Sequence, residues 1–352
     1  MENGKMYVAA LLAAAISFVS APEAVSALSP EASEYLVRLA TGTLYVHYTE
    51  LYEDKQYSSE AESVWESSDV SAEESVAEES SDGASVSTPP PEGAIAVGAI
   101  NLSRLEVDDA PALLLINETD YKADLDALAK RQINIKGGSV LIIHTHGTEA
   151  YLPDGRDYYT EEDEFRSTDC SKNVVAVGEV FAEVLRENGI TVYHDRTLFD
   201  EHAFNSAYAS SRAACRQWLA DHSDIAYIID IHRDAVTDGK GARMKTMCTV
   251  DGKEMAQVML VMGTDEAGAS HPYWEDNLSL AARYQSALCS KLTFARPIYL
   301  RSASYNQQLT RGSMLIEVGS DANTIGEAKD AARLAARLFA ELYGDINGIS
   351  KA

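Results

Sequence analysis

The chain has 352 residues, of which 46% are hydrophobic, so it can bury a sizeable core in one or two domains. Its 29 basic and 55 acidic residues give a formal net charge of -26. This balance argues against nucleic acid as a ligand, because phosphates are bound by clustered lysine and arginine side chains. It also disfavours electrostatic adhesion to an anionic membrane surface.

An uncharged apolar run covers residues 6–21, directly after Lys5. As a helix it would span roughly 24 Å, at about 1.5 Å per residue, slightly less than the roughly 30 Å hydrocarbon core of a bilayer. Two interpretations stay open: a cleaved secretory signal, with a small-residue site at residues 25–27, and an uncleaved membrane anchor. Both export the rest of the chain. We favour the anchor, because the apolar run could be extended through Val25 to Leu28 around Pro22 and Glu23. Residues 1–28 are therefore predicted to hold the protein at the cell membrane, with the remaining chain outside the cytoplasm.

Residues 58–93 have a different composition, dominated by serine and glutamate and closing on three consecutive prolines at 89–91. Apolar periodicity is absent, so the segment cannot bury enough hydrophobic surface to offset the entropy cost of ordering it. We predict a disordered linker, which is either a spacer between a membrane and a catalytic domain or a solvated connection without a partner. Residues 29–57 form a short juxtamembrane segment with helical spacing near its start.

The cysteines are an even number in a chain predicted to be exported, which permits disulfides. Their spacing fits no zinc motif. Cys215 and Cys289 lie in helical patterns beside alanine and leucine, which favours buried free thiols, and no pairing is assigned.

From about Ala94 onward, apolar runs alternate with amphipathic helical patterns, which predicts one α/β domain over residues 94–352. The predicted fold has three layers, a mostly parallel sheet flanked by helices, and is phosphorylase/hydrolase-like. Asp251-Gly252 lies between two strand-like runs and predicts a hairpin, so one edge of the sheet should be antiparallel. The predicted strands are 112–116, 140–144, 190–193, 226–231, 247–250, 257–262 and 314–318, and the predicted helices are 174–188, 206–222, 278–293 and 324–343.

Three of these strands end in polar residues that are unusual after a buried strand. These residues are His144, His146 and Glu149 after the first strand, Asp230, His232 and Arg233 at the second, and Glu317 at the third. In open α/β sheets, ligands bind outside the carboxyl ends of the strands, so the side chains are expected at one edge. Two imidazoles and two carboxylates are the parts of a catalytic zinc site, in which three protein ligands leave a fourth position for water.

Two ligand sets fit the spacing. In the first, His146 and Glu149 bind zinc as neighbours on a single turn, at i and i+3, and His232 completes the set. In the second, His144 takes the place of Glu149, because residues i and i+2 of a strand face the same side. We prefer the first set, since it leaves Glu317 free as the general base and gives His144 a supporting role one step deeper.

Each residue also has an ordinary structural explanation. A histidine at a strand end is more often a hydrogen-bonded core or surface residue than a ligand, and an HxxE pair alone is weak evidence. Glu317 could be a buried acid paired with Arg311. The metal site is favoured because all three polar clusters end apolar strands of one domain. Asp230, on the same strand face as His232, is well placed to fix the tautomer of that imidazole.

Several stretches resemble the stage II sporulation protein P family, whose members are membrane-anchored cell-wall hydrolases of endospore-forming bacteria. The stretches are "VLIIHTHGTEAYLP", "NVVAVGEVFAEVL", "IIDIHRDA" and "IEVGSDANTIGEAKDAARLAARL", with "LLLINETDYKADL" before them. The resemblance covers roughly residues 110–345, with the motifs in matching order, and does not extend to the acidic linker.

The family is similar to zinc N-acetylmuramoyl-L-alanine amidases, which cut the amide between muramic acid and the stem peptide, and it is also credited with endopeptidase activity on cross-links. The arrangement further resembles zinc carboxypeptidases, in which an HxxE pair and a distant histidine hold the metal and a late glutamate is the base. Carried onto this sequence, the resemblance implies Zn2+ ligands His146, Glu149 and His232 and a catalytic Glu317. Amidases usually place the ligand glutamate farther from the first histidine, and Glu149 departs from that pattern.

The implied function is hydrolysis of peptidoglycan in septal wall degradation and engulfment during sporulation, with a lytic transglycosylase and a membrane protein as partners. Arg233, next to a ligand, either binds a carboxylate of the stem peptide or pairs with Asp234. Two alternative functions are a zinc peptidase that acts mainly on cross-links and a wall-binding scaffold without catalysis.

Overall fold

The structure, a computed structural model, describes residues 90–103, 113–133, 135 and 137–348. The predicted membrane segment (1–28), the juxtamembrane segment (29–57) and nearly all of the predicted linker (58–93) lie outside these residues. Among the described residues, no helix is both long and apolar enough to span a bilayer. The predictions for the N-terminal part of the chain therefore stay predictions.

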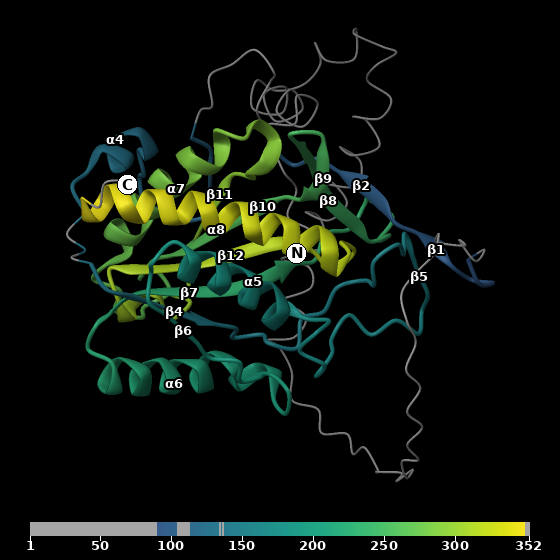
Figure 1. The fold of residues 1–352 in the computed structure, drawn as a ribbon, viewed down its shortest axis with the longest axis horizontal. Helices are drawn as coiled ribbons and strands as arrows, with labels where there is room; N and C mark the ends of the chain where they lie inside the picture. Colours follow the sequence, from purple (N-terminus) through teal and green to yellow (C-terminus); the bar gives the residue numbers. More distant parts are fainter. Residues whose placement is uncertain (1–89, 104–112, 134, 136, 349–352) are drawn as a thin grey trace, which may run out of the picture. The chain divides into compact units, whose positions relative to one another are not determined.

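A seven-stranded, mostly parallel sheet forms the centre of the fold (Figure 1). Its strands are β3 (Leu115–Asn117), β4 (Ser139–Ile143), β6 (Val192–His194), β7 (Ile225–Asp234), β10 (Val258–Gly263), β11 (Ile298–Arg301) and β12 (Gly312–Ser320). Their order across the sheet is β3-β11-β10-β12-β7-β4-β6. The last four run parallel to one another, the first three form a second parallel group, and the groups meet at the antiparallel pair of β10 and β12.

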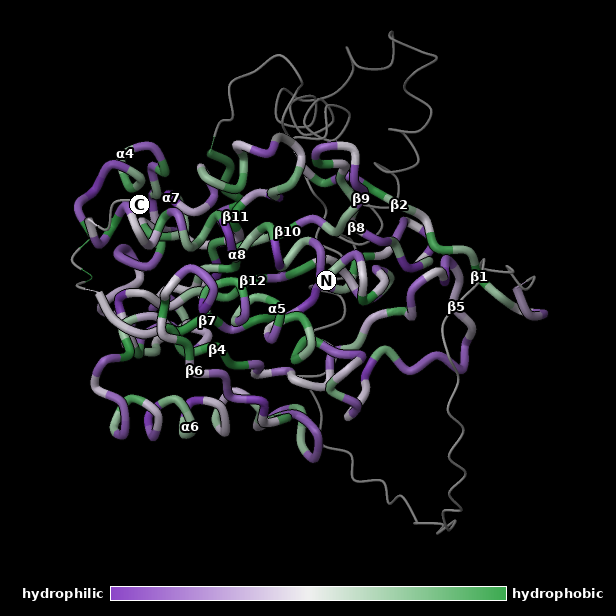
Figure 2. Tube along the Cα trace, in the orientation of Figure 1, coloured by the Kyte–Doolittle hydropathy of each residue, from purple (hydrophilic) through white to green (hydrophobic). Residues whose placement is uncertain are grey.

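Helices cover both faces of the sheet and give the fold three layers. α5 (Val174–Glu187), α7 (Trp274–Cys289) and α8 (Ile325–Asn347) contribute to the large core on one face. α6 (Ala207–Asp221) packs on the other face, with Cys215 in a smaller core. Hydrophobic residues concentrate in central strands such as β4 and β7, whereas α6 mixes hydrophobic and hydrophilic residues (Figure 2). The predicted α/β fold with a mostly parallel sheet flanked by helices is confirmed.

Alternation along the strands decides which side chains face α6. Ile229 and Ile231 of β7 belong to the large core with α5, α7 and α8. Because successive residues of a strand point to opposite faces, Asp230 and His232 lie on the α6 side. Glu317 of β12 is in register with His232 and shares that side. The polar residues at these strand ends are therefore kept out of the large core.

The predicted hairpin turn at Asp251-Gly252 is present, but the hairpin does not belong to the main sheet. Both residues have positive φ, 52° and 79°, as a tight two-residue hairpin turn requires. The turn joins β8 (Met244–Val250) to β9 (Lys253–Ala256), which form a separate three-stranded sheet with β2 (Gly98–Ile100). The antiparallel pair of the main sheet is central, and the predicted antiparallel edge is wrong.

Short elements escape the sequence analysis, because two to six residues cannot show a periodic pattern. The helix α4 packs on α7, and β1 pairs with β5. These elements are β1 (Ile95–Ala96), β5 (Tyr158–Tyr159), α4 (Leu125–Lys130) and the 3₁₀ helices η3 (Phe204–Ser206), η4 (Leu292–Phe294) and η5 (Gln307–Leu309). All four cysteines are free, and Cys215 and Cys289 are buried as predicted.

Candidate metal centre

Three side chains converge at the carboxyl ends of β4 and β7: His146, Glu149 and His232. One nitrogen or oxygen atom of each lies within 4.8 Å of the corresponding atoms of the other two. The Glu149 carboxylate lies between the imidazoles, with Oε1 3.5 Å from Nδ1 of His146 and Oε2 3.3 Å from Nδ1 of His232. Glu149 and His232 are buried, whereas His146 is partly exposed. The structure thus brings together the three residues predicted as ligands.

Strand pairing explains this convergence. β4 and β7 are parallel neighbours, and Ile143 at the end of β4 pairs with Asp230. The chain therefore leaves β4 beside His232. It then forms a tight turn, in which the amide of Glu149 donates to the carbonyl oxygen of His146 at 3.0 Å. The HxxE spacing puts both side chains on this one turn, within reach of the neighbouring strand.

Opposite charges hold the cluster together against the cost of burial. Burial raises the pKa of Glu149, but His232 and the nearby His146 outweigh this effect and keep the pKa well below its usual value. Burial lowers the pKa of His232, but Asp230 and Glu149 outweigh this effect and raise the pKa well above its usual value. The carboxylates of Asp230 and Glu149 therefore stabilise a positive charge between them. A protonated imidazole or a bound cation can supply this charge.

Asp230 contacts His232 from the other side of the ring. Its Oδ1 lies 2.9 Å from Nε2 of His232. The same oxygen accepts a hydrogen bond from the backbone amide of Thr145 at 2.8 Å, and Oδ2 accepts one from the Thr145 hydroxyl at 2.6 Å. A carboxylate at Nε2 leaves Nδ1 of His232 directed at Glu149, the arrangement in which metal-binding histidines are commonly held. Asp230 therefore lies where the sequence analysis expects a residue that orients His232.

Glu317 lies beside His232, because the two residues pair across β12 and β7. Burial raises the pKa of Glu317 to about 8; His232 acts against this shift, while Asp234 adds to it. The alternative partner Arg311 pairs with Asp276. Among the described residues, Oε2 of Glu317 is buried without a hydrogen-bond partner. An orphaned carboxylate oxygen beside His232 and near Glu149 fits a site that binds a cation and water.

The family described as Stage II sporulation protein P (SpoIIP) matches residues 25–340 of the sequence. The chain belongs to this family. Stage II sporulation protein P of Bacillus subtilis (strain 168) is 30% identical over 208 residues, which are 56% of this chain and 49% of that protein. The chain thus spans about half the length of this relative. The resemblance noted in the motifs is confirmed.

Solved amidase structures show a weak likeness. The CwlD amidase from Clostridioides difficile, in complex with the GerS lipoprotein, is 13% identical over 60% of this chain and 100% of that chain, with a TM-score of 0.37. The N-acetylmuramyl-L-alanine amidase Ami1 from Mycobacterium smegmatis is 14% identical over 60% of this chain and 99% of that chain, with a TM-score of 0.34. These scores are too low to carry an argument about this member of the family.

His144 lies outside the cluster, so the ligand set that replaces Glu149 with His144 is not the one assembled. Its buried ring places Nδ1 3.0 Å from the carbonyl oxygen of Ile231 and Nε2 2.9 Å from Nε2 of His194. Nδ1 of His194 lies 3.0 Å from Oε2 of Glu179. Since a carbonyl oxygen only accepts, Nδ1 of His144 carries the hydrogen. Burial lowers the pKa of His144 to about 3, so the ring is neutral.

This chain of side chains ties β4, β6 and α5 to the part of β7 that precedes His232. The sequence analysis missed His194 and Glu179. His194 ends β6 much as His144 follows β4, so the same strand-end signal was available for it.

Gly178 of α5 gives the His144 ring its space. A Cβ atom added there would lie 2.4 Å from Cε1 and 2.5 Å from Nε2 of His144. We expect Gly178→Ala to destabilise the protein by about 1–3 kcal/mol, the usual cost of overpacking a core, although alanine favours helix by roughly 1 kcal/mol. Denaturant unfolding measures the difference, with Glu183→Ala on the exposed face of α5 as the control. A midpoint equal to that of the wild type would contradict the tight contact.

Arg233 holds the segment that carries Glu149. Its Nε donates to the carbonyl oxygen of Ala150 at 3.2 Å, and its Nη2 donates to that of Phe165 at 2.6 Å. The predicted alternative of an ion pair with Asp234 is wrong, because the Asp234 carboxylate pairs with Arg296 at 2.7 Å. The guanidinium of Arg233 instead donates its hydrogen bonds mainly to backbone carbonyl oxygens.

Aromatic side chains from η3 and α6 line the partly exposed His146. The ring of Phe204 stacks on it, with centroids 4.4 Å apart and planes at 20°, and Tyr208 meets it edge-on at 5.4 Å. Phe204 is 41% exposed, so part of its ring faces solvent beside His146. Neither residue stands out in the sequence, because contact with His146 arises only from the packing of α6 against the sheet.

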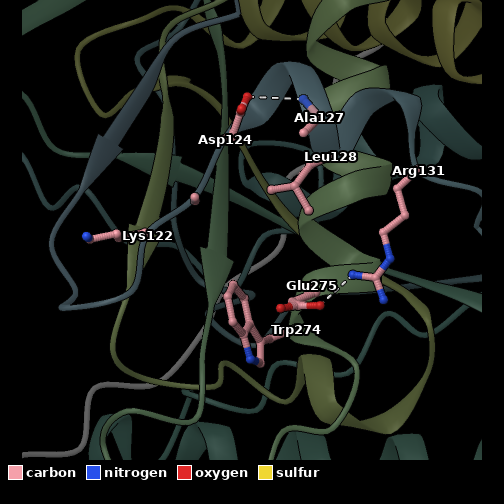
Figure 3. A pocket seen from close by; sticks show the side chains of 8 residues that line it. Lys122, Asp124, Ala127, Leu128, Arg131, Trp274 and Glu275 are labelled. Atoms are coloured by element: carbon pink, nitrogen blue, oxygen red, sulfur yellow. Dashed lines mark hydrogen bonds and ion pairs between the residues drawn. The ribbon is translucent and has the colours of Figure 1, made fainter.

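A cavity of about 370 Å³ lies between α4 and α7, away from the candidate metal centre (Figure 3). Trp274, which stacks on Tyr121 at 4.9 Å, and an ion pair between Arg131 and Glu275 at 2.6 Å form part of its lining. α7 follows the carboxyl end of β10, and β10 is antiparallel to β12. The cavity therefore belongs to the opposite edge of the sheet and takes no part in the cluster.

Proposed function

We propose that this chain is an exported zinc hydrolase of the cell wall, which cleaves the amide between N-acetylmuramic acid and L-alanine of peptidoglycan. The observation that carries the proposal is the convergence of His146, Glu149 and His232 beside Glu317. Membership of the stage II sporulation protein P family supports a role in sporulation. Within sporulation, we place this activity in septal wall degradation and engulfment.

The donor set suits Zn2+. Two imidazole nitrogens and one carboxylate are a common ligand set of catalytic zinc, and a zinc ion so held lowers the pKa of its water towards about 7. His146, Glu149 and His232 would hold the ion. Asp230 would keep Nδ1 of His232 available to it, and Arg233 would fix the segment of Glu149.

Glu317 is the residue that we propose as general base. A base works best when its pKa lies near the working pH, and the pKa of Glu317 is raised to about 8. Its carboxylate accepts a proton from the attacking water, whose oxygen bonds to the amide carbon. When the carbon–nitrogen bond breaks, Glu317 returns the proton to the departing amine, so one residue serves both halves of the reaction.

Analysis of the products from purified wall tests the bond that is cut. The proposal expects free stem peptides that begin with L-alanine, together with glycan strands of unchanged length. Cleaved cross-links without released stem peptides would favour the peptidase. Binding to the wall without new chain ends and without bound metal would favour the scaffold.

We further propose that the N-terminal segment anchors the protein in the cell membrane with its catalytic domain outside, where it acts with a lytic transglycosylase and a membrane-protein partner. The apolar run at residues 6–21 and the family resemblance support this placement. Extraction of membranes with alkaline carbonate tests it, because an anchored chain stays with the lipid whereas a chain with a cleaved signal is released.

A further inference from the structure

A second cavity, of about 460 Å³, is built from segments that also carry the metal cluster. Three arginines line it: Arg166, Arg233 and Arg243. Arg166 forms a backbone bridge with Glu149, and Arg233 directly follows His232. The cavity therefore shares its walls with the candidate metal centre, yet the proposed reaction gives Arg166 and Arg243 no role.

Most charges around this cavity are already engaged. Arg243 pairs with the buried Asp321, and Arg233 donates to backbone carbonyls. Of the other acids in the lining, Asp163 pairs with Arg156 at 2.5 Å and Glu164 is exposed to solvent. Arg166 keeps its Nε and Nη2 groups without a partner among the described residues.

Arg166 is anchored on one side and open on the other. Its Nη1 donates to Oδ2 of Asp200 at 2.6 Å and to the hydroxyl of Thr148 at 3.0 Å. The Asp200 side chain is fully buried and also accepts from the amide of Thr148 at 3.0 Å, so the anchor is rigid. A guanidinium has five N–H donors, and within the described part of the chain the Nε and Nη2 groups have no partner. The side chain is 43% exposed.

Phe204 links this guanidinium to the metal cluster. Cζ of Arg166 lies 4.6 Å from the centre of the Phe204 ring, which stacks on His146 at 4.4 Å. A stacked arginine is held flat with its edge free, and that edge matches the two oxygens of a carboxylate. The free donors of Arg166 thus lie two stacking distances from a proposed zinc ligand.

We propose that Arg166 binds the carboxylate of the stem-peptide residue that follows L-alanine. The inference rests on the proposed function, since it needs the scissile amide at the cluster. An extended peptide advances roughly 3.5 Å per residue, so the second residue places its carboxylate roughly 7 Å from the amide nitrogen that leaves. The two contacts through Phe204, of 4.6 and 4.4 Å, keep the guanidinium within this order of distance of His146. Sugar hydroxyls carry no charge, so the peptide rather than the glycan is the part of the substrate that a free guanidinium selects.

Two soluble muropeptides test the inference on the complete zinc-loaded chain. They are identical except that the second residue of one carries a free carboxylate, which the other carries as a primary amide. We expect the wild type to prefer the carboxylate. Arg166→Gln should lower kcat/KM on the carboxylate substrate by about 10- to 100-fold, mostly through KM, and change the amide substrate by less than about 3-fold, because one charge-assisted pair is lost.

Controls separate recognition from a structural role. Arg166→Lys keeps the charge without the fork and should recover part of the preference. Lys172→Gln removes an exposed cation that pairs with Asp169 outside the cavity, and should change neither substrate. Equal cleavage of both substrates by the wild type would overturn the inference, and so would loss of zinc from Arg166→Gln.

Calorimetric measurement of the binding of the same two muropeptides tests the carboxylate subsite without relying on cleavage. If neither is cleaved, the proposed function fails. A binding preference for the carboxylate that disappears in Arg166→Gln would still support the subsite, and its absence would overturn it.

Discussion

Replacing His232 with alanine is expected to remove both the bound zinc and the digestion of purified wall. Under the proposed function the imidazole supplies one of three ligands, and it lies between the buried carboxylates of Asp230 and Glu149. Its loss leaves two carboxylates without the positive charge that they surround. Metal content by mass spectrometry and release of stem peptides from wall measure the two effects, and circular dichroism shows whether the variant is folded.

Two further variants provide comparisons for His232→Ala, one with a smaller expected effect and one with none. Asp230→Asn keeps the shape of the residue that orients His232, and zinc affinity should fall by only about 10- to 100-fold, as for other outer-shell partners. His222→Ala removes an imidazole that stacks on Trp218 near the amino end of β7, and it should retain zinc and activity. Full zinc and full activity in His232→Ala would show that the metal centre is elsewhere.

The grouping of the three candidate ligands could be predicted because the relevant sequence signals are local. His146 and Glu149 belong to one turn, and His232 ends a strand whose apolar run is easy to recognise. The rule that ligands gather at the carboxyl ends of parallel strands then predicts that the two segments lie close together. The pairing of Ile143 with Asp230 is what places these two segments side by side.

What the sequence left open depends on distant packing. Arg311 was a plausible partner for Glu317 by proximity in sequence, yet the strand between them separates the two residues by roughly 20 Å at about 3.3 Å per residue. Likewise, Phe204 lies in the short helix η3 and Arg166 in a loop, and nothing local places them against His146 or Thr148. Such contacts follow from the way α6 and the loops settle on the sheet.

The order of the strands in the sheets also depends on contacts between distant segments. Asp251-Gly252 signals a hairpin through its backbone conformation, but a turn carries no information about which sheet receives its strands. β11 escaped notice because it has four residues directly after Pro297, too few for a pattern. Without β11, the central position of the antiparallel β10–β12 pair could not be deduced.

Glu317→Gln is the variant with the next largest expected effect. The amide keeps the size of the side chain and its place beside His232, but it cannot accept the proton of the attacking water. We expect the variant to retain zinc and to bind purified wall normally, while turnover falls by roughly 10²- to 10⁴-fold, the usual contribution of a general base. Glu254→Gln, at an exposed position of β9, serves as the control and should leave turnover unchanged.

Metal content and turnover of this variant, measured together, assign the role of Glu317. Loss of zinc would make Glu317 a ligand, and Glu149, which lies between the two histidines, would become the candidate base. Normal zinc with normal turnover would refute the mechanism, because a neutral amide cannot serve as the base. Normal zinc with the predicted loss of turnover is the outcome expected of the raised pKa and the orphaned oxygen of Glu317, since a carboxylate kept without a partner beside the cluster is available for the proton.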